Sequence, residues 1–317
     1  MQNVLLNKIE YSFCGNIPVV PRDIPHGDMP GDKIQVTDEF INKANTIFPK
    51  LLECMKLILK EENRKRIVIT VCGGSGVGKS TIASILSFYF NQMEIGCYTL
   101  SGDNYPHRIP QYNDAERLRI FREAGLKGMI QNGEYSLKRY EQIRLWQHEG
   151  MDADPSLQKK YSWFSSYLVS GRKALEGYLG TSYEIGFDEV EEIVSLFKGD
   201  KNAIWLKRMG RKEEDLWYEQ VDFSECSVLI IEWTHGNSDY YHGVDIPVLL
   251  NSTPKETMEY RRARNRDGAT DSPFTTMVLE IEQELLKRQA HKAKIILSKQ
   301  GELLSYEQYQ ALMMRES

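Results

Sequence analysis

A glycine-rich run at residues 73–80 has the composition and spacing that can hold a polyphosphate. It reads Gly-Gly-Ser-Gly-Val-Gly-Lys-Ser, which matches the pattern G-x-x-x-x-G-K-[ST] at every fixed position. Glycines let backbone N–H groups curl around phosphate oxygens, the Lys79 side chain can reach the β- and γ-phosphates, and the Ser80 hydroxyl can ligate Mg²⁺. The sequence therefore predicts a nucleoside-triphosphate loop. Its residues are Gly73, Gly74, Ser75, Gly76, Val77, Gly78, Lys79, Ser80 and Thr81.

An acid follows the next apolar run of the chain. Residues 97–101 are typical of a strand, and the segment Gly102-Asp103-Asn104 comes directly after it. In an open parallel sheet, ligands bind beyond the carboxyl ends of the strands, so we expect Asp103 to lie near the γ-phosphate. It could take a proton from an acceptor hydroxyl, because a loose phosphoryl-transfer transition state needs only a weak base. A plain turn residue is the alternative, since Gly-Asp-Asn also suits a turn.

A second carboxylate closes another apolar run. Residues 227–232 end in Glu232, at the position where an acid holds Mg²⁺ directly or through water. The alternative is an ordinary acid at the end of a strand. His235 follows on the same rim, where a hydrogen-bonding loop residue is favoured over a general base.

Arginines are concentrated in the segment 261–266, which follows the apolar run 246–250 and is expected to be helical. Such a cluster is often only a solvated helix face. Here it follows a strand of the same sheet, so we expect a lid that stabilises charge during transfer and excludes water. Arg264 and Arg266 are the candidate catalytic residues of this lid, and Arg261 and Arg262 are candidate nucleotide-binding residues.

The elements that must position these residues alternate short apolar runs with helical patterns, which is typical of a parallel sheet with crossover helices. The strand-like runs are 67–72, 97–101, 227–232, 246–250 and 295–297. About 125 residues separate the second run from the third, and a loop of that length needs structure of its own. Helical patterns near 114–130, 136–150 and 156–179, then a hairpin of 203–209 with 216–221, make this insert a subdomain.

The chain divides into a leader and a larger domain. Residues 1–62 form an N-terminal arm and helices: 1–36 are expected to be irregular with one short strand, and a helical pattern from Thr37 is broken or kinked at Pro49. This leader either packs on the sheet or pairs two subunits in a homodimer. Residues 63–317 form the phosphate-binding domain, and the acceptor-binding insert spans 104–226.

The composition excludes several classes of protein. The 317 residues carry a formal net charge of −5, which argues against a nucleic-acid partner. We expect no membrane association, because no stretch approaches a membrane span and the start lacks a signal-peptide pattern. Five widely spaced cysteines without a Cys-x-x-Cys pair favour reduced thiols in the cytoplasm, and no protein-held metal cage is expected.

Together these motifs resemble the phosphoribulokinase/uridine kinase family of P-loop kinases over roughly residues 64–300. The resemblance implies a P-loop NTPase three-layer α/β fold, with a five-stranded parallel sheet of order 2-3-1-4-5, helices on both faces and a mostly helical insert. It implies an enzyme that transfers the γ-phosphoryl group of ATP, with Mg²⁺, to a hydroxyl of a small molecule. In this family the acid that matches Asp103 is the catalytic base, and basic hairpin residues contact the substrate. The candidate acceptor-binding residues are therefore Asp103, Tyr105, Arg208, Arg211 and His235.

Departures from the family pattern keep other functions open. Glu232 is followed by Trp instead of Gly, and the Tyr-Asp-Phe and Thr-His-x-Arg signature of uridine kinases is missing, which disfavours a nucleoside acceptor. The segment 100–104 also resembles adenylylsulfate kinase, a much shorter family. Aromatic residues gathered in the insert could stack on a sugar or could form a helical core, and a carbohydrate is the favoured acceptor. A nucleotide-dependent regulatory module is the alternative of another class.

Overall fold

The computed structural model describes residues 4–12, 17–61, 64–253, 255–259 and 272–316. The chain forms two compact units. The first comprises 1–105, 186–253 and 286–317, and the second comprises 106–185 and 254–285. Among the described residues, no helix has the length and apolar character required to cross a bilayer.

The first unit is built on a sheet of five parallel strands and one short antiparallel strand. In chain order the strands are β1 (Ile67–Gly73), β2 (Gly96–Ser101), β5 (Cys226–Glu232), β6 (Ile246–Leu250), β7 (Ile295–Leu297) and β8 (Leu303–Leu304). They lie side by side as β2-β5-β1-β6-β7-β8, and β8 pairs antiparallel with β7. For the five parallel strands this is the order 2-3-1-4-5 predicted from the sequence. The sixth strand is an addition, because a run of two residues has no periodicity to detect.

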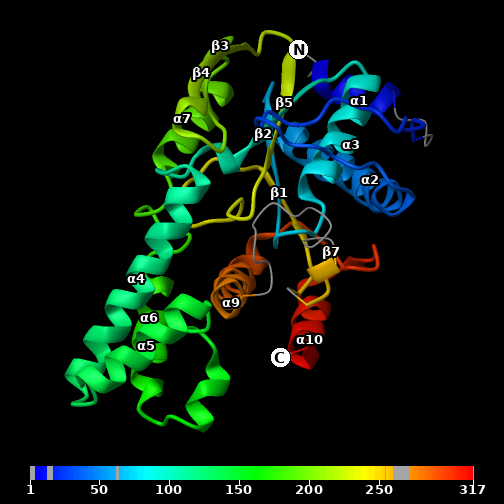
Figure 1. Cartoon of the computed structure of the whole chain (residues 1–317). Coiled ribbons are helices and arrows are strands. Elements are labelled where there is room, and N and C mark those ends of the chain that lie inside the picture. The colour runs from blue at the N-terminus through cyan, green and yellow to red at the C-terminus, as the bar shows by residue number, and fades with distance from the viewer. Residues whose placement is uncertain (1–3, 13–16, 62–63, 254, 260–271, 317) are drawn as a thin grey trace. The chain divides into compact units, whose positions relative to one another are not determined.

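Helices cover both faces of this sheet (Figure 1). On one face lie α2 (Asp38–Glu61) and α3 (Lys79–Gln92), and α7 (Phe187–Lys198) lies on the other. Every residue of β1 is buried, as expected for a central strand covered on both faces. Two further helices, α1 (Val4–Ser12) and α10 (Tyr306–Glu316), and the 3₁₀ turns η1 (Gly102–Asn104) and η4 (Ala290–Lys292) complete the sheet unit.

The secondary structure of residues 4–61 differs in part from the sequence prediction. Residues 4–12 form the helix α1 instead of irregular chain, and no strand occurs among residues 17–36. Pro49 lies inside α2, which runs without interruption through both apolar stretches. Proline removes a single backbone donor from a helix, and α2 buries apolar residues on both sides of Pro49, so packing on the sheet outweighs that local loss.

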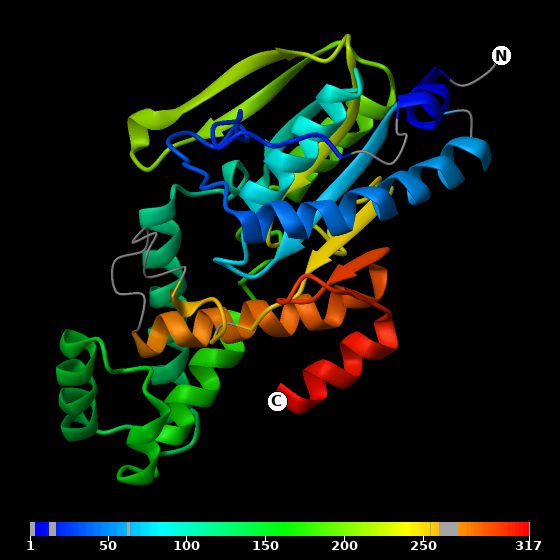
Figure 2. The ribbon, with the colours of Figure 1, turned by 90° about the vertical axis from the view of Figure 1, so that its right-hand side faces the viewer.

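A two-stranded hairpin belongs to the same unit. It consists of β3 (Ala203–Met209), the 3₁₀ turn η3 (Glu213–Asp215) and β4 (Leu216–Asp222), paired antiparallel as the sequence predicted. Most of β4 is exposed, whereas the second half of β3 is buried. Figure 2 shows this yellow-green hairpin beside the dark blue N-terminal segment that precedes α2.

The second unit is helical. It contains α4 (Pro110–Gln131), α5 (Leu137–Glu149), η2 (Pro155–Lys159), α6 (Phe164–Glu176) and most of α9 (Pro273–Gln289). Its core is aromatic: the rings of Trp146 and Trp163 stack with centroids 5.8 Å apart, and Phe121 packs edge-on against Tyr167. These insert aromatics therefore fill a hydrophobic core.

Candidate active site

The glycine-rich loop connects β1 to the first turn of α3, as its pattern predicted. Gly78 caps α3 with a φ of 93°, a left-handed conformation that residues with a Cβ rarely adopt. A Cβ at this position would also lie 2.2 Å from the ring of Phe40 on α2. The Lys79 ammonium donates a hydrogen bond to the Gly74 carbonyl oxygen at 3.1 Å, so it lies across the loop. Backbone and lysine thus form a cradle at the start of a helix.

Glu232 lies beside this loop because β5 is the neighbour of both β1 and β2. In the parallel ladder it pairs with Val71 on one side and Ser101 on the other. The Ser80 hydroxyl donates to Glu232 Oε2 at 3.1 Å, and the Ser101 hydroxyl donates to Oε1 at 2.6 Å. The predicted strand-end acid is therefore held at the phosphate loop by one serine from the loop and one from β2.

The electrostatic surroundings of Glu232 bring the predicted residues together. Burial is the main cause that raises the pKa of Glu232, and the Asp103 carboxylate raises it further. The Lys79 ammonium opposes this shift, as do the two serine hydrogen bonds. Asp103 and Lys79 thus both lie close enough to Glu232 to act on its charge. Two carboxylates facing one lysine would be stabilised by a further cation.

This donor set fits Mg²⁺. Magnesium prefers oxygen ligands and usually retains waters, so a serine hydroxyl and one carboxylate at the rim of a triphosphate cradle suit it. Ser80 and Glu232 supply those oxygens, and a divalent ion would favour the charged form of Glu232, which burial and Asp103 disfavour. The loop glycines supply the N–H groups for the phosphates of ATP.

Asp103 lies on the exposed side of the turn η1, directly after β2. The preceding Gly102 is pressed against the fully buried Trp233, and a Cβ on Gly102 would lie 2.0 Å from Cγ of that indole. Trp233 takes the place where the family pattern has Gly, and its ring supports the turn from below. The carboxylate of Asp103 is therefore presented from a rigid support.

The turn is also held from the N-terminal segment. Asp28 Oδ1 accepts hydrogen bonds from the Ser101 amide at 2.7 Å and from Asn104 Nδ2 at 3.2 Å, on the two sides of Asp103. The amide of Met209 on the hairpin donates to Asn104 Oδ1 at 3.0 Å. Ser101 has its amide available because β2 is an edge strand of the sheet.

The remaining predicted residues have diverse surroundings. Thr81 and Tyr105 are buried, and the Tyr105 hydroxyl has no hydrogen-bond partner among the described residues. His235 is buried against the rings of Phe187 and Trp233, which agrees with a structural loop residue. Arg211 is exposed in the hairpin turn. The lid arginines Arg261, Arg262, Arg264 and Arg266 lie outside the described residues.

Sequence reasoning identified Arg208 but not the residue that holds it. The guanidinium of Arg208 pairs with Asp28 at 2.9 Å, and both side chains are buried. Asp28 stands in a Pro- and Gly-rich stretch without periodicity, so no sequence signal distinguishes it. Ser101 was detectable, because a serine at the end of a strand beside the Glu232 strand faces the same rim.

Comparison with known proteins supports the nucleotide site. The adenylylsulphate kinase family model matches residues 65–119, a segment that includes the glycine-rich loop and Asp103. The bifunctional α-galactosidase/sucrose kinase AgaSK of Mediterraneibacter gnavus is 42% identical over 243 residues. The matched part covers 77% of this chain but only 21% of that protein, so the chain spans about one fifth of its relative's length.

Solved structures with a similar chain path have little sequence in common with this one. A candidate fructose transport system kinase from Silicibacter sp. TM1040 is 13% identical, with a TM-score of 0.43 over 73% of this chain and 93% of that one. A possible uridine kinase from Bacillus stearothermophilus is also 13% identical, with a TM-score of 0.40 over 78% and 96%. In its phosphate-binding loop, its sheet order and its matched sequence segment, this chain is similar to P-loop small-molecule kinases, which agrees with the resemblance in its motifs.

Proposed function

We propose that this chain is an ATP-dependent kinase that phosphorylates a carbohydrate hydroxyl, with sucrose as the first candidate acceptor. The observation that carries the proposal is the meeting of Lys79, Ser80, Asp103 and Glu232 at the ends of β1, β2 and β5. The relative named as a sucrose kinase supports the acceptor class, because the matched segment is long and 42% identical.

In the proposed reaction the acceptor hydroxyl gives its proton to the Asp103 carboxylate while its oxygen attacks the γ-phosphorus of ATP. The bond from the γ-phosphorus to the β–γ bridging oxygen breaks, and ADP leaves. Lys79 and the loop amides stabilise charge on the phosphate oxygens. Mg²⁺, held through Ser80 and Glu232, would neutralise charge on the β- and γ-phosphates. The arginines at 261, 262, 264 and 266 remain the proposed lid.

Adenylylsulfate is a second candidate acceptor, because the family model that matches residues 65–119 is that of adenylylsulphate kinase. The match ends far before Glu232 and the hairpin, so it covers the phosphate loop, the acid and only the first residues of the insert. A nucleoside acceptor has no comparable support in the sequence.

The experiment is a phosphorylation screen with Mg²⁺ and radiolabelled ATP against sucrose, fructose, glucose, glycerol, uridine and adenylylsulfate. We expect labelled product with one or more of the carbohydrates. Lys79→Ala, which removes the ammonium across the loop, should lower the transfer rate at least ~10²-fold. Lys127→Ala on α4, an exposed lysine paired with Glu123, is the matched control and should keep the wild-type rate. Transfer to adenylylsulfate alone would replace the carbohydrate by the second candidate.

The cellular setting is proposed on chemical grounds. The described cysteines Cys54, Cys72, Cys97 and Cys226 are all free thiols. Such thiols, together with dependence on ATP, favour the cytoplasm. A homodimer formed through residues 1–62 stays a prediction, to be checked by light scattering.

A further inference from the structure

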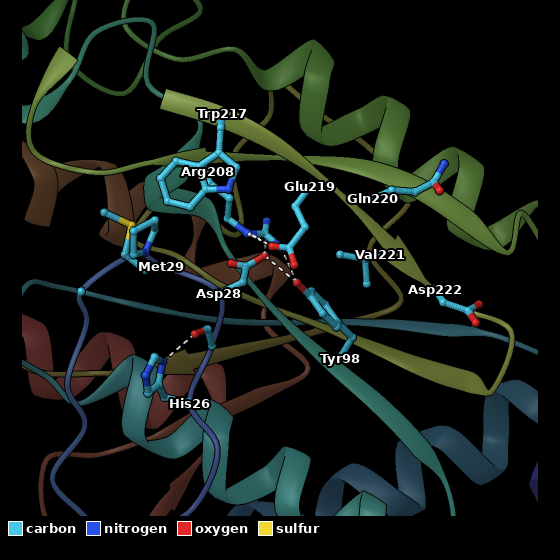
Figure 3. Close-up of a pocket in the computed structure, with 13 residues that line it drawn as sticks. His26, Asp28, Met29, Tyr98, Arg208, Trp217, Glu219, Gln220, Val221 and Asp222 are labelled. Atoms are coloured by element: carbon cyan, nitrogen blue, oxygen red, sulfur yellow. Dashed lines mark hydrogen bonds and ion pairs between the residues drawn. The ribbon is translucent and has the colours of Figure 1, made fainter. Parts of the chain in front are cut away.

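A pocket of about 720 Å³ opens between the N-terminal segment and the hairpin (Figure 3). Residues 26–31 form one side, and residues 217–222 of β4 form the other, with Tyr98 of β2 and Arg208 of β3 between them. Its volume lies within the ~300–1,000 Å³ typical of small-molecule sites. All of its walls belong to the sheet unit.

The floor of the pocket is a buried ion pair. Asp28 and Arg208 have side chains only 7% and 5% exposed, and Arg208 Nη1 lies 2.9 Å from Asp28 Oδ2. The Tyr98 hydroxyl donates to Asp28 Oδ2 at 3.0 Å and accepts from Arg208 Nη2 at 2.8 Å. A buried ion pair is costly unless it is well satisfied, and it contributes less to stability than apolar packing would. The pair therefore contributes little to stability, and its hydrogen bonds fix the N-terminal segment against β2 and β3 at the floor of the pocket.

The walls combine an aromatic face with acceptors. Trp217 is about half exposed and lies above Arg208 in Figure 3, and Glu219 Oε2 accepts from Arg208 Nε at 3.1 Å. A flat indole beside fixed carboxylate and guanidinium groups suits a polyol, since its C–H face can pack on the ring while its hydroxyls exchange hydrogen bonds with the charged groups.

The charge of the pocket selects among acceptors. Asp28 and Glu219 both pair with Arg208, and Asp222 is a third acid of the lining, so the acids outnumber the permanent cations among the lining residues. An anionic acceptor such as adenylylsulfate would meet uncompensated carboxylates, whereas a neutral sugar would not.

One end of the pocket is joined to the turn that carries the proposed catalytic base. Asp28 Oδ2 faces Arg208, while its Oδ1 accepts from Ser101 and Asn104, the residues that bracket Gly102 and Asp103. The Asp28 carboxylate therefore lies between the pocket and the turn of Asp103 and contacts both. The single carboxylate of Asp28 thus lines the pocket, accepts hydrogen bonds from the turn and pairs with Arg208 of the hairpin.

We propose that this pocket binds the neutral carbohydrate acceptor, with Trp217 packing on its ring and the exposed carboxylate of Glu219 accepting from its hydroxyls above the Asp28–Arg208 floor. The inference rests on the proposed function and deepens it: the N-terminal segment, which lies outside the kinase-like part of the chain, supplies half of the acceptor site. Asp28 forms the floor of this site with Arg208 and also positions the turn of Asp103.

The test compares two exposed tryptophans on one hairpin. Trp217 lines the pocket on β4, whereas Trp205 on β3 is 60% exposed and is not among the lining residues, so both can be replaced without opening a core. We expect Trp217→Ala to raise the KM for sucrose roughly tenfold, because an aromatic contact with the ring is lost. The KM for ATP should not change, and kcat should change little. Trp217→Phe should restore most of the affinity, and Trp205→Ala should match the wild type.

Direct binding supplies the second measurement. Titration calorimetry of sucrose into the full chain, with a non-hydrolysable ATP analogue and Mg²⁺ present, should show the same loss of affinity for Trp217→Ala only. Equal sucrose affinities for the two alanine variants, or equal losses in both, would overturn the pocket assignment while leaving the kinase function intact. A wild-type chain that phosphorylates no carbohydrate would instead remove the proposed function, and this inference with it.

Discussion

Asp103 and Glu232 are two acids on one rim with opposite environments. Glu232 is buried and bonded to two serines, and burial raises its pKa, whereas Asp103 is exposed on its turn. A buried, oriented carboxylate suits a metal ligand, and an exposed one can meet an incoming hydroxyl. The proposed roles of the two acids, Glu232 as a metal ligand and Asp103 as the base, thus follow from the difference in their burial.

We expect Asp103→Asn to lower kcat by ~10²–10⁴-fold while the affinity for ATP stays close to that of the wild type, because the amide keeps the shape but cannot accept the proton. Single-turnover transfer and binding of a fluorescent ATP analogue measure the two quantities. Asp114→Asn, an exposed acid at the start of α4, is the control. Loss of ATP binding in Asp103→Asn would show that this acid holds the nucleotide and not the acceptor.

Gly102→Ala tests the support beneath Asp103. A Cβ 2.0 Å from the Trp233 ring must displace either the indole or the turn, because both are buried. We expect transfer to fall more than tenfold and the free energy of unfolding to fall by about 1–3 kcal/mol. In Gly177→Ala the nearest neighbour of the new Cβ is 3.5 Å away, so that variant should behave as the wild type. Unchanged transfer in Gly102→Ala would mean that the turn does not position the base.

Arg66 joins four elements at the amino ends of the strands. Arg66 directly precedes β1. Its guanidinium donates to the carbonyls of Phe197 and Lys201 at 2.9 and 2.8 Å, and to the Phe223 carbonyl at 2.8 Å. It also lies over the Phe197 ring, 4.9 Å from the centroid. One side chain thus fixes the end of α7 and the end of the hairpin to the central strand, opposite the proposed site.

Arg66→Lys should destabilise the sheet unit by about 2–4 kcal/mol, because a single ammonium cannot satisfy carbonyls that the planar guanidinium reaches together. Urea unfolding followed by circular dichroism measures the change. Lys65→Arg next to it is the control, since the Lys65 side chain is 81% exposed and pairs with the half-exposed Asp200. A shift below about 0.5 kcal/mol in Arg66→Lys would show that the elements are held by apolar packing alone.

Over the whole molecule, the buried Asp28 makes stability depend on pH. Burial raises the pKa of Asp28 from 3.8 to about 6, against the opposing effects of Arg208, Ser101 and Tyr98. The folded state therefore binds this proton more tightly than the unfolded state does. The contribution of Asp28 to stability then falls as the pH rises from about 4 to about 6, by a total of ~3 kcal/mol, and stays at its lower value above that range.

Asp28→Asn removes this dependence, because an amide does not titrate. Arg208 stays charged throughout, since its own pKa is raised by Asp28 and Glu219 against burial. We expect the difference in unfolding free energy between wild type and Asp28→Asn to change between pH 4 and 6 and to be flat from 6.5 to 8. Denaturant unfolding at intervals of half a pH unit measures it, and a difference that is flat over the whole range would contradict a buried, titrating Asp28.

Part of the architecture could be predicted from the sequence, because its signals are local. The phosphate loop and the hairpin at 203–221 follow from contiguous patterns, and the order of the five parallel strands follows from the family resemblance that the motifs carry. The acid at 103 and the acid at 232 were predictable for the same reason, since each lies at the end of a short run typical of a strand, or directly after it.

Only the tertiary structure decided which distant side chains meet those residues. Asp28 and Arg208 are 180 positions apart, and the segment that carries Asp28 has neither helical nor strand periodicity. Trp233 beneath Gly102 and the continuous α2 through Pro49 likewise depend on packing against other elements. Sequence periodicity shows which side of one helix or strand is buried. A pocket between the N-terminal segment, an edge strand and a hairpin depends on long-range packing, which exists only in the folded chain.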